Sequence, residues 1–250
     1  MTDRTEELFR DDAYLKTCDA TVVAVNERGG IVLDRTVFYY TGGGQPGDRG
    51  TLTSEDGTIV EIGTTINADG DILHIPASEN QPVLPVGAKV TAAIDWGNRY
   101  KHMQMHTALH LICVLVPCAI TGCQIGTEKS RIDFNPEGLE TAGITLDKEG
   151  LTADLNALAA RDIPLNAEWI SDAELDANPD LVRTMSVEPP RGLGKVRLIR
   201  IANPGEGNAV DLQPCGGTHV ARTGEIAALQ VTKIENKGRN NRRINIVFEG

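Results

Sequence analysis

The segment from Asn98 to Val116 divides the chain into two parts that differ in composition. It contains neither Gly nor Pro, and Pro117 follows it directly. Apolar residues recur along it at intervals of six, three and four, at Met103, Leu109, Ile112 and Val116. A long uninterrupted segment with this spacing predicts a buried or half-buried helix that ends at the proline.

The residues before this helix predict β structure. Short β-branched and apolar runs are separated by turns such as Asp56-Gly57 and Asp69-Gly70. Many short strands joined by tight turns are typical of a small barrel or a sandwich. The expected strands are Thr21–Val25, Ile31–Leu33, Val37–Tyr40, Thr58–Ile62, Ile72–Ile75 and Val90–Ile94. A segment that contains two prolines, Asn80–Gly87, is expected to be a loop.

The residues after the helix predict an α+β arrangement. A helix is expected at Leu151–Arg161, and another begins at Ser171, because Ser171 and Glu174 have capping-box spacing. The expected strands are Arg131–Phe134, Val196–Ile201, Ile226–Ile234 and Arg242–Phe248. We therefore expect two domains, a β domain over residues 1–95 and an α+β domain over residues 96–250.

The overall composition indicates a globular chain whose thiols are reduced. Apolar residues make up 40% of the chain, and no run of about 18 apolar residues is present to span a membrane. The segment Met1–Asp12 is charged and lacks the apolar stretch of a secretory signal. Five cysteines at irregular spacing argue against a disulfide framework. We expect a cytoplasmic protein without a membrane partner.

The charge of the chain is distributed unevenly. A net charge of −11 argues against broad nucleic-acid binding. Two segments are nevertheless basic. Arg191–Arg200 contains no acidic residue, and Glu235 is the only acidic residue in Lys233–Arg243. On charge alone, a solvated surface is favoured over a surface that meets a phosphate backbone.

The predicted helix carries three histidines, His102, His106 and His110, at intervals of four. Residues four apart project from the same helix face, so two imidazoles at this spacing can bind one metal ion. Ordinary packing of the histidines is the alternative. The spacing makes His102–His106 and His106–His110 equally good pairs.

A second pair of candidate ligands lies about a hundred residues later, in Pro214-Cys215-Gly216-Gly217-Thr218-His219. The two glycines argue against a helix and favour a tight loop. A thiolate and an imidazole on such a loop form half of a zinc site, and a glycine turn with a buried cysteine is the alternative. Together the two pairs supply three nitrogens and one sulfur, a soft ligand set that suits zinc better than magnesium or calcium.

These two motifs, His106–Leu111 and Cys215–His219, resemble the paired zinc motifs of alanyl-tRNA editing domains. Such domains occur inside alanyl-tRNA synthetases and as free-standing AlaX proteins. Further segments resemble the same family, including the glycine-rich motif of its longer forms: Gly42–Pro46 with Asp48–Gly50, Gln124–Gly126, Ser130–Phe134 and Lys237–Arg243. The resemblance runs from about residue 20 to the end of the chain.

The resemblance implies a fold and a metal site. The fold is an N-terminal β-barrel followed by an α+β editing domain shared with threonyl-tRNA synthetase. The ligands of one zinc ion per chain are His106, His110, Cys215 and His219, so that His102 is a neighbour. The implied reaction is hydrolysis of the ester that links a wrongly attached serine or glycine to alanine tRNA.

The resemblance also implies contacts to the substrate. Gln124 matches a pocket glutamine of the family, and Thr107 and Thr127 are candidates for sensing a serine hydroxyl. Gly42, Gly43 and Gly44 are candidates for presenting backbone N–H groups to the terminal adenosine or a phosphate. The implied tRNA contacts are Lys237, Arg239, Arg242 and Arg243. No residue is assigned as the catalytic base.

Several alternatives remain open from the sequence. The chain can be a non-catalytic, zinc-dependent RNA-binding protein or a zinc hydrolase of another substrate class. A fragment of alanyl-tRNA synthetase is disfavoured, because no aminoacylation domain precedes these motifs and the chain begins with Met1. We expect a monomer. Asp211 is expected to be exposed or to cap a turn rather than to orient a metal ligand.

Overall fold

A computed structural model describes residues 4–185, 194–205, 207–238 and 241–250. The chain separates into two compact units, Met1–Tyr100 and Lys101–Gly250. The boundary between them falls within the long helix α1 (Trp96–Leu115), which the uninterrupted segment predicts. Among the described residues, no helix combines the length and the apolar character that a membrane-spanning segment requires.

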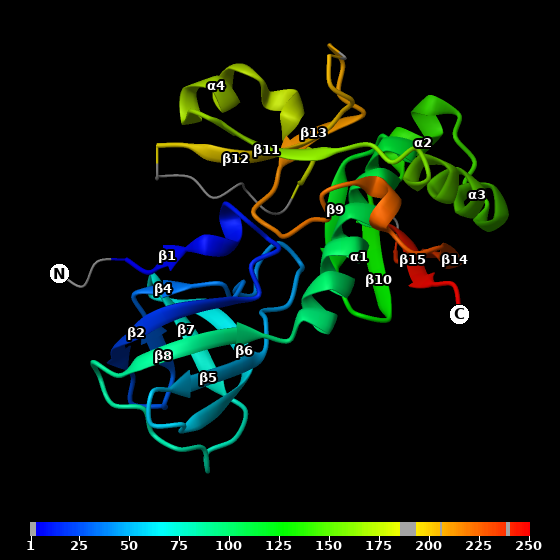
Figure 1. Ribbon diagram of the computed structural model, residues 1–250. Coiled ribbons are helices and arrows are strands. Elements are labelled where there is room, and N and C mark those ends of the chain that lie inside the picture. The colour runs from blue at the N-terminus through cyan, green and yellow to red at the C-terminus, as the bar shows by residue number, and fades with distance from the viewer. Residues whose placement is uncertain (1–3, 186–193, 206, 239–240) are drawn as a thin grey trace. The chain divides into compact units, whose positions relative to one another are not determined.

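The N-terminal unit is built on a closed barrel with the strand order β2-β3-β7-β6-β5-β8, drawn in blue to cyan in Figure 1. Its strands are β2 (Thr17–Val25), β3 (Ile31–Leu33), β5 (Gly50–Ser54), β6 (Ile59–Ala68), β7 (Asp71–Pro76) and β8 (Lys89–Ile94). Side chains that point inward pack a core that includes Leu33, Leu52, Val60 and Ala92, all fully buried. The expected barrel is therefore confirmed.

One strand prediction in this unit is wrong, and one strand was not predicted. The apolar run Val37–Tyr40 is buried but irregular, since it follows the short strand β4 (Arg35–Thr36), which pairs with β1 (Glu6–Glu7). Its N–H groups bond to side chains instead of a strand: Phe38 N donates to Thr36 Oγ1 and Tyr39 N to Asp48 Oδ2. Conversely, no prediction included β5, which begins at a glycine and is rich in hydroxyl side chains. A Cβ on Gly50 would lie 2.0 Å from the carbonyl oxygen of Ala93.

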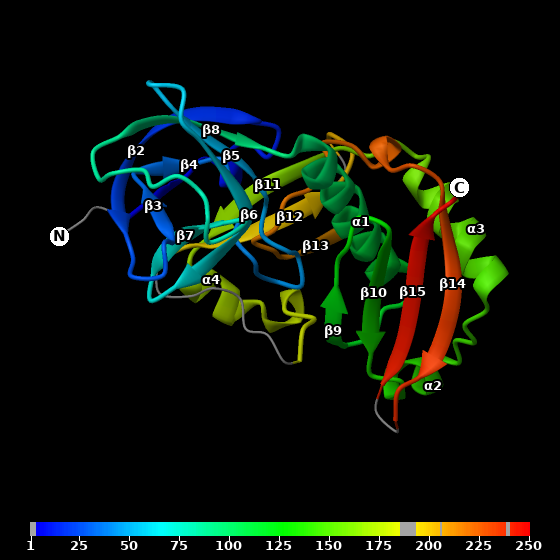
Figure 2. The same ribbon diagram turned by 90° about the horizontal axis from the view of Figure 1, so that it is seen from below.

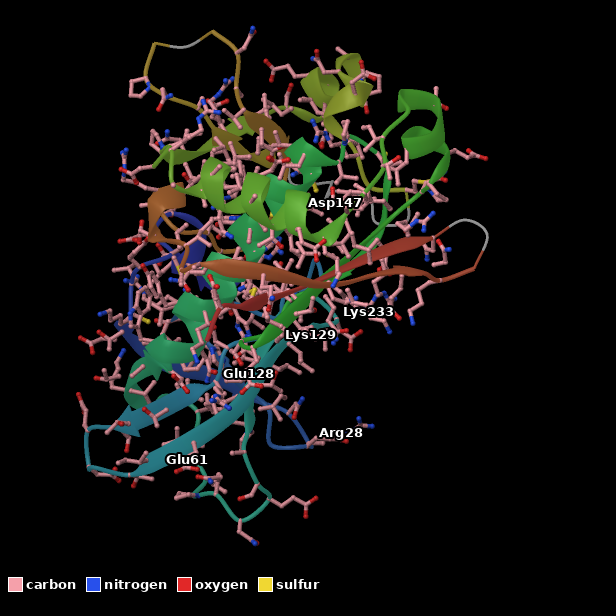
Figure 3. The ribbon with its side chains drawn as sticks, turned by 90° about the vertical axis from the view of Figure 1, so that its right-hand side faces the viewer. Arg28, Glu61, Glu128, Lys129, Asp147 and Lys233 are labelled. Carbon is pink, nitrogen blue, oxygen red and sulfur yellow. The ribbon has the colours of Figure 1, made fainter. Side chains whose placement is uncertain are left out.

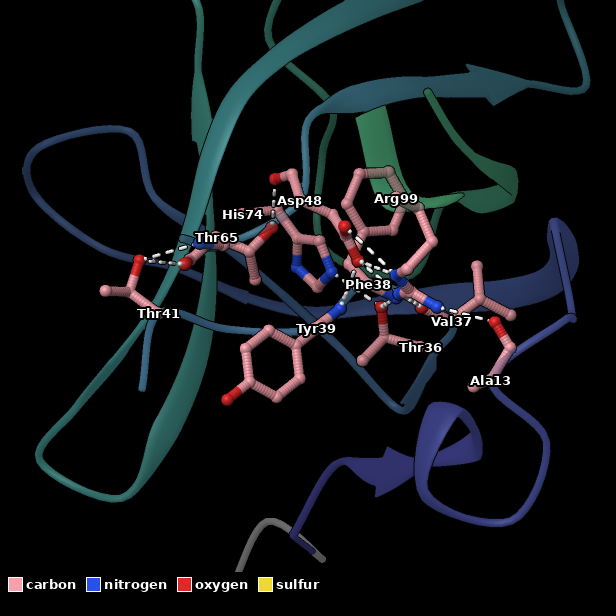
Figure 4. Close-up of polar contacts among 11 residues, drawn as sticks. Ala13, Thr36, Val37, Phe38, Tyr39, Thr41, Asp48, Thr65, His74 and Arg99 are labelled. Carbon is pink, nitrogen blue, oxygen red and sulfur yellow. Dashed lines mark hydrogen bonds and ion pairs between the residues drawn. The ribbon is translucent and has the colours of Figure 1, made fainter. Parts of the chain in front are cut away.

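A network of buried polar groups stabilises this unit (Figure 4). The guanidinium of Arg99 forms a fully buried ion pair with Asp48 and donates to the carbonyl oxygens of Val37 and Ala13. The imidazole of His74 is also fully buried, with Nε2 2.8 Å from Thr36 Oγ1 and Nδ1 3.0 Å from the carbonyl oxygen of Ile31. Both groups are satisfied by protein partners alone.

The C-terminal unit contains two antiparallel sheets and several helices. One sheet has the order β14-β15-β10-β9 and the other β11-β12-β13. Figure 2 shows the four strands of the first sheet side by side. The strands are β9 (Ile120–Gln124), β10 (Lys129–Phe134), β11 (Leu165–Ile170), β12 (Val196–Ile201), β13 (Asp211–Pro214), β14 (Leu229–Asn236) and β15 (Arg242–Phe248). The helices after α1 are α2 (Glu137–Ala142), α3 (Lys148–Ala159) and α4 (Asp172–Ala177).

Most of the predicted elements of this unit are confirmed. Strands β12 and β15 have the expected bounds, and Ser171 is the N-cap of α4, with a complete capping box to Glu174. The predictions omitted β9, β11, β13 and α2. These short elements lack a clear apolar period, and the packing of the unit decides their conformation.

Both edges of the four-stranded sheet are occupied by the chain itself. At the β14 edge, Asn156 of α3 accepts from Leu229 N and donates to Leu229 O, at 2.9 and 2.7 Å, and Thr152 Oγ1 accepts from Val231 N. At the β9 edge, Ile120 bonds through its backbone to Arg183 and Met185. The outer strands are therefore joined to neighbouring segments of the chain.

Candidate metal centre

Helix α1 places two histidines on one buried face. The ring centroids of His106 and His110 are 5.4 Å apart, and each residue is 5% exposed. His102 lies one turn earlier and is also buried, but it is not a member of the group whose ligand atoms converge. The structure therefore brings together the pair that the family motif implies.

The loop after β13 supplies the other two members of the group. Arg197 of β12 holds this loop, because its Nη1 donates to the carbonyl oxygens of Cys215 and Gly217, both at 3.0 Å. Gly217 N lies 3.4 Å from the Cys215 Sγ. The loop is thereby folded so that Cys215 and His219 face the same point.

The four side chains converge on this point. Sγ of Cys215 lies 3.4 Å from Nε2 of His106 and 3.2 Å from Nε2 of His219. One candidate ligand atom from each of His106, His110, Cys215 and His219 lies within 4.8 Å of all the others. Three imidazoles and one thiol at this separation can hold a metal ion.

Two ligand rings are oriented by buried partners. Nδ1 of His110 lies 2.9 Å from Oδ2 of Asp211, which also accepts a hydrogen bond from the amide of Gln213. The amide nitrogen of Gln213 also lies 2.9 Å from His110 Nδ1, but it already donates to Asp211. Because the Asp211 carboxylate can only accept, we assign a proton to Nδ1 of His110, which leaves Nε2 for a metal ion. The preferred interpretation of Asp211 as exposed or capping is wrong, since it is 2% exposed and contacts a candidate ligand.

Thr107 orients the second ring. Its hydroxyl donates to the carbonyl oxygen of Met103 at 2.9 Å and accepts from Val220 N at 3.3 Å. The remaining lone pair faces Nδ1 of His219 at 3.2 Å. Because a hydroxyl has one proton and two lone pairs, Nδ1 of His219 is the donor in this contact. Nε2 of His219 is therefore left with its lone pair toward Cys215.

The electrostatics of the group favour the metal-binding form of Cys215 and His219 but not of His110. Burial would lower the pKa of His110, but its hydrogen bonds with Asp211 and Cys215 raise that pKa to about 10, so a metal ion must displace a proton from this ring. Burial would raise the pKa of the Cys215 thiol, but the adjacent His106 and His219 lower it well below its ordinary value. Burial lowers the pKa of His219 to about 3, and the neighbouring His106 acts in the same direction. A thiolate beside a neutral imidazole is the state that coordinates a metal ion.

The other predicted substrate contacts lie at different places. Gln124 ends β9 with an exposed side chain, and its Oε1 accepts from Nε of Arg131 at 3.1 Å. Thr127 is half-buried in the turn between β9 and β10, and no hydrogen bond of its hydroxyl occurs among the described residues. Of the three predicted contacts, only Thr107 is joined directly to a residue of the metal group.

The glycine-rich motif belongs to the N-terminal unit. Gly42 and Gln45 form a short bridge through two backbone hydrogen bonds of 3.0 and 2.9 Å. Gly43 and Gly44 between them have φ angles of 55° and 82°. This left-handed conformation favours glycine and explains the composition of the turn.

The predicted tRNA contacts also separate. Arg242 and Arg243 are consecutive in β15, so their side chains point to opposite faces of the sheet. Arg243 bonds to both oxygens of Asp133, at 2.7 and 2.8 Å, and Lys237 lies 3.2 Å from Glu235. Arg239 lies outside the described residues.

The sequence predictions missed Gln213 and Arg197. A signal for Gln213 was present, because Asp211, Gln213 and Cys215 alternate along one segment and side chains two residues apart share a face of a strand. Arg197 carried no local signal, since its contacts with the loop depend on the pairing of β12 with β13.

Comparisons with known proteins show which family this chain resembles. The family described as "Threonyl and Alanyl tRNA synthetase second additional domain" matches residues 196–245, and "tRNA synthetases class II (A)" matches residues 11–98. Alanyl-tRNA editing protein AlaX-M of Methanosarcina mazei is 37% identical over 248 residues, which cover 96% of this chain and 95% of that protein.

Two further relatives come from other archaea. AlaX-M of Saccharolobus solfataricus is 34% identical over 245 residues, which cover 96% of this chain and 97% of that protein. AlaX-L of Pyrococcus horikoshii is 34% identical over 248 residues, which cover 96% of this chain and 57% of that protein. Since relatives at this level of identity match nearly the whole chain, the protein belongs to the AlaX family of alanyl-tRNA editing proteins.

Proposed function

We propose that this protein hydrolyses the ester bond of alanine tRNA that carries the wrong amino acid, with serine as the main substrate and glycine as a poorer one. The observation that carries the proposal is the convergence of His106, His110, Cys215 and His219 in a chain of the AlaX family. The names of the relatives supply the substrate class, alanyl-tRNA.

The proposed metal is one zinc ion per chain. Three imidazole nitrogens and a thiolate form a ligand set that zinc favours, and Asp211 and Thr107 hold two of the rings in the required tautomer. When bound, zinc supplies a Lewis acid for an ester carbonyl or a water molecule. The protein groups bind it, orient the rings and keep the Cys215 side chain in its thiolate form.

Selectivity for serine over alanine needs a polar group that meets the extra hydroxyl. An apolar pocket discriminates weakly, whereas a buried polar group left unpaired by alanine costs about 1–3 kcal/mol, or roughly 5- to 150-fold in rate. The Thr107 hydroxyl is saturated by three partners, and Gln124 is engaged by Arg131. We therefore assign the sensing of serine to the hydroxyl of Thr127.

The experiment compares deacylation of alanine tRNA charged separately with serine, glycine and alanine, under single-turnover conditions. We expect wild type to act fastest on the serine form. Thr127→Val should narrow the ratio of serine to alanine rates by roughly 5- to 150-fold, with zinc content unchanged. Thr107→Val is the matched control, since it should reduce zinc affinity and leave the ratio unchanged.

The outcomes separate the parts of the proposal. Equal rates on serine-charged and alanine-charged tRNA in wild type would refute the editing function. Zinc-loaded protein that binds tRNA without any deacylation would instead identify a zinc-dependent RNA-binding protein. A serine preference that survives Thr127→Val would remove the assignment of Thr127 alone. The cytoplasmic location, the monomeric state and the domain boundary at residue 95 remain predictions.

A further inference from the structure

The four-stranded sheet of the C-terminal unit has two different faces. Ser130, Ile132, Ile244 and Ile246 point to one face and are each at most 2% exposed. Helix α3, in which Leu151, Leu155 and Leu158 are buried, lies against the edge strand β14. The residues that alternate with them point to the other face, which we name the charged face. Its polar members are Lys129, Arg131, Asp133, Lys233, Glu235, Arg243 and Asn245, with Lys237 at its end, and Val247 lies on the same face opposite Lys129.

The arginines of the charged face are held in a fixed network. Asp133 is 4% exposed and accepts from Nη1 of Arg131 at 2.8 Å and from Nε and Nη2 of Arg243 at 2.7 and 2.8 Å. Two guanidinium groups on one carboxylate leave a net positive charge at the centre of the sheet. The side chains of Arg131 and Arg243 remain 30% and 23% exposed.

The lysines of the charged face are more exposed than its arginines. Lys129 is exposed and forms no ion pair with the described residues. Lys233 and Lys237 share a single carboxylate, that of Glu235, at 2.7 and 3.2 Å. Figure 3 shows Lys129 and Lys233 on one side of the strands and Asp147, the N-cap of α3, on the other. Even with Glu128 in the adjacent turn, cations exceed carboxylates here.

This local excess of cations is unusual in a protein with a net charge of −11. We propose that the charged face binds the phosphate backbone of the tRNA substrate along its double-helical acceptor arm. The proposal rests on the proposed function and adds to it the surface that holds the RNA. It also replaces the predicted contact Arg242, which points to the opposite face of β15, by Lys129, Arg131 and Lys233.

The geometry of a sheet suits a duplex backbone. Side chains two residues apart on a strand lie about 7 Å from each other, and neighbouring strands are about 5 Å apart, so the cations form a broad two-dimensional array. Double-stranded RNA is recognised mainly through its shape, its phosphates and its 2′-hydroxyls. Arg131 also bonds to Gln124, a predicted substrate contact, so the array extends to the edge strand β9.

The test is binding of uncharged alanine tRNA transcript to zinc-loaded protein over a range of salt concentrations. In Lys129→Glu/Lys233→Glu, the slope of log affinity against log salt should fall by about two, and affinity should fall more than ~10-fold at ~100 mM salt. Zinc content should stay as in wild type. The matched control is Lys148→Glu/Arg161→Glu, which makes the same change in charge at the two ends of α3.

The expected result is a large loss in the first pair and less than ~3-fold change in the control. An unchanged salt slope in the first pair, or an equal loss in the control, would overturn the proposal. So would lysine-dependent binding of vesicles that contain anionic phospholipid, together with unchanged tRNA binding. Failure of wild type to release serine would reject the proposed function, whereas lysine-dependent tRNA binding would still support the surface.

Discussion

The two units each bury a cluster of ionisable side chains, and the clusters differ in whether protein atoms complete them. In the N-terminal unit, Arg99 meets Asp48 and two carbonyl oxygens, and both ring nitrogens of His74 have partners. In the C-terminal unit, the Nε2 atoms of His106 and His219 lie 3.4 and 3.2 Å from the Cys215 Sγ.

The groups that a buried polar cluster brings together indicate its role. Donors that face acceptors satisfy one another, so the first cluster contributes to folding and requires no ligand. Atoms that all offer lone pairs cannot satisfy one another by hydrogen bonds. A bound cation would therefore stabilise the second cluster.

The largest effect is expected from removal of a metal ligand. Purified wild type should contain about one zinc per chain. Cys215→Ala and His106→Ala should lose most of that zinc and, with it, deacylation of serine-charged tRNA. His102→Ala is the control and should retain both properties. Elemental analysis gives the answer, and full zinc content in both ligand variants would disprove the site.

The next largest effect concerns the buried ion pair of the barrel. Arg99→Met leaves the Asp48 carboxylate buried without its partner and should destabilise the N-terminal unit by about 3–5 kcal/mol. The chain has two tryptophans, Trp96 and Trp169, in different units. Urea unfolding followed by Trp96 fluorescence in a Trp169→Phe background therefore reports on the N-terminal unit.

The double variant Arg99→Met/Asp48→Leu tests whether the unpaired charge of Asp48 causes this loss of stability. It removes the unpaired charge, so it should recover part of the lost free energy of unfolding. Zinc content should stay near one per chain in both variants. If Arg99→Met costs less than about 1 kcal/mol, the ion pair is not the stabilising feature of this cluster.

A smaller effect is expected from acid titration of His74. Burial lowers its pKa to about 4 from an ordinary value of 6.5. The folded state therefore holds His74 neutral, and the unfolded state takes up a proton first as the pH falls. The contribution is complete above pH 6.5 and is lost between pH 6.5 and 4, by about 3 kcal/mol in total.

The variant His74→Gln isolates this contribution. The difference in unfolding free energy between wild type and variant should shrink as the pH is lowered from 7 to 4. Urea unfolding at a series of pH values, with Trp96 fluorescence as the signal, measures the difference. A difference that stays constant over this range would show that His74 does not titrate as its burial implies.

The smallest effect is expected at the residues that orient the ligand rings. Asp211→Asn and Thr107→Val keep all four ligands but weaken the control of the ring tautomers, so zinc affinity should fall by about 10- to 100-fold. Competition with a chromogenic chelator measures that affinity. Thr107→Ser restores the hydroxyl and should recover wild-type affinity; without such recovery, Thr107 acts only through packing.

Much of the fold could be predicted from sequence where one local period dominates. Residues close together in the chain predict the long helix α1, strands β12 and β15, and the capping box at Ser171. The run Val37–Tyr40 had the composition of a strand, but its N–H groups bond to the side chains of Thr36 and Asp48. Asp48 is distant in sequence, so local composition could not reveal this.

The candidate site divides in the same way. The four members of the metal group were predicted because their motifs are local and resemble a family. The environment of each member was not predicted, since Asp211 meets His110, and Thr107 meets His219, across about a hundred residues. Such contacts are decided by the packing of distant segments. That packing also decides whether the hydroxyl of Thr107 or of Thr127 is available to a substrate.

The side chains of α3 that bond to β14 have a further consequence for the tendency of the chain to aggregate. An unpaired outer strand is a template on which another polypeptide can add a strand, and aggregation often begins in this way. Here Asn156 and Thr152 occupy the backbone groups of Leu229 and Val231, and Ile120 on the opposite edge pairs with the chain near Arg183. The sheet is thereby closed to the addition of a further strand at these positions.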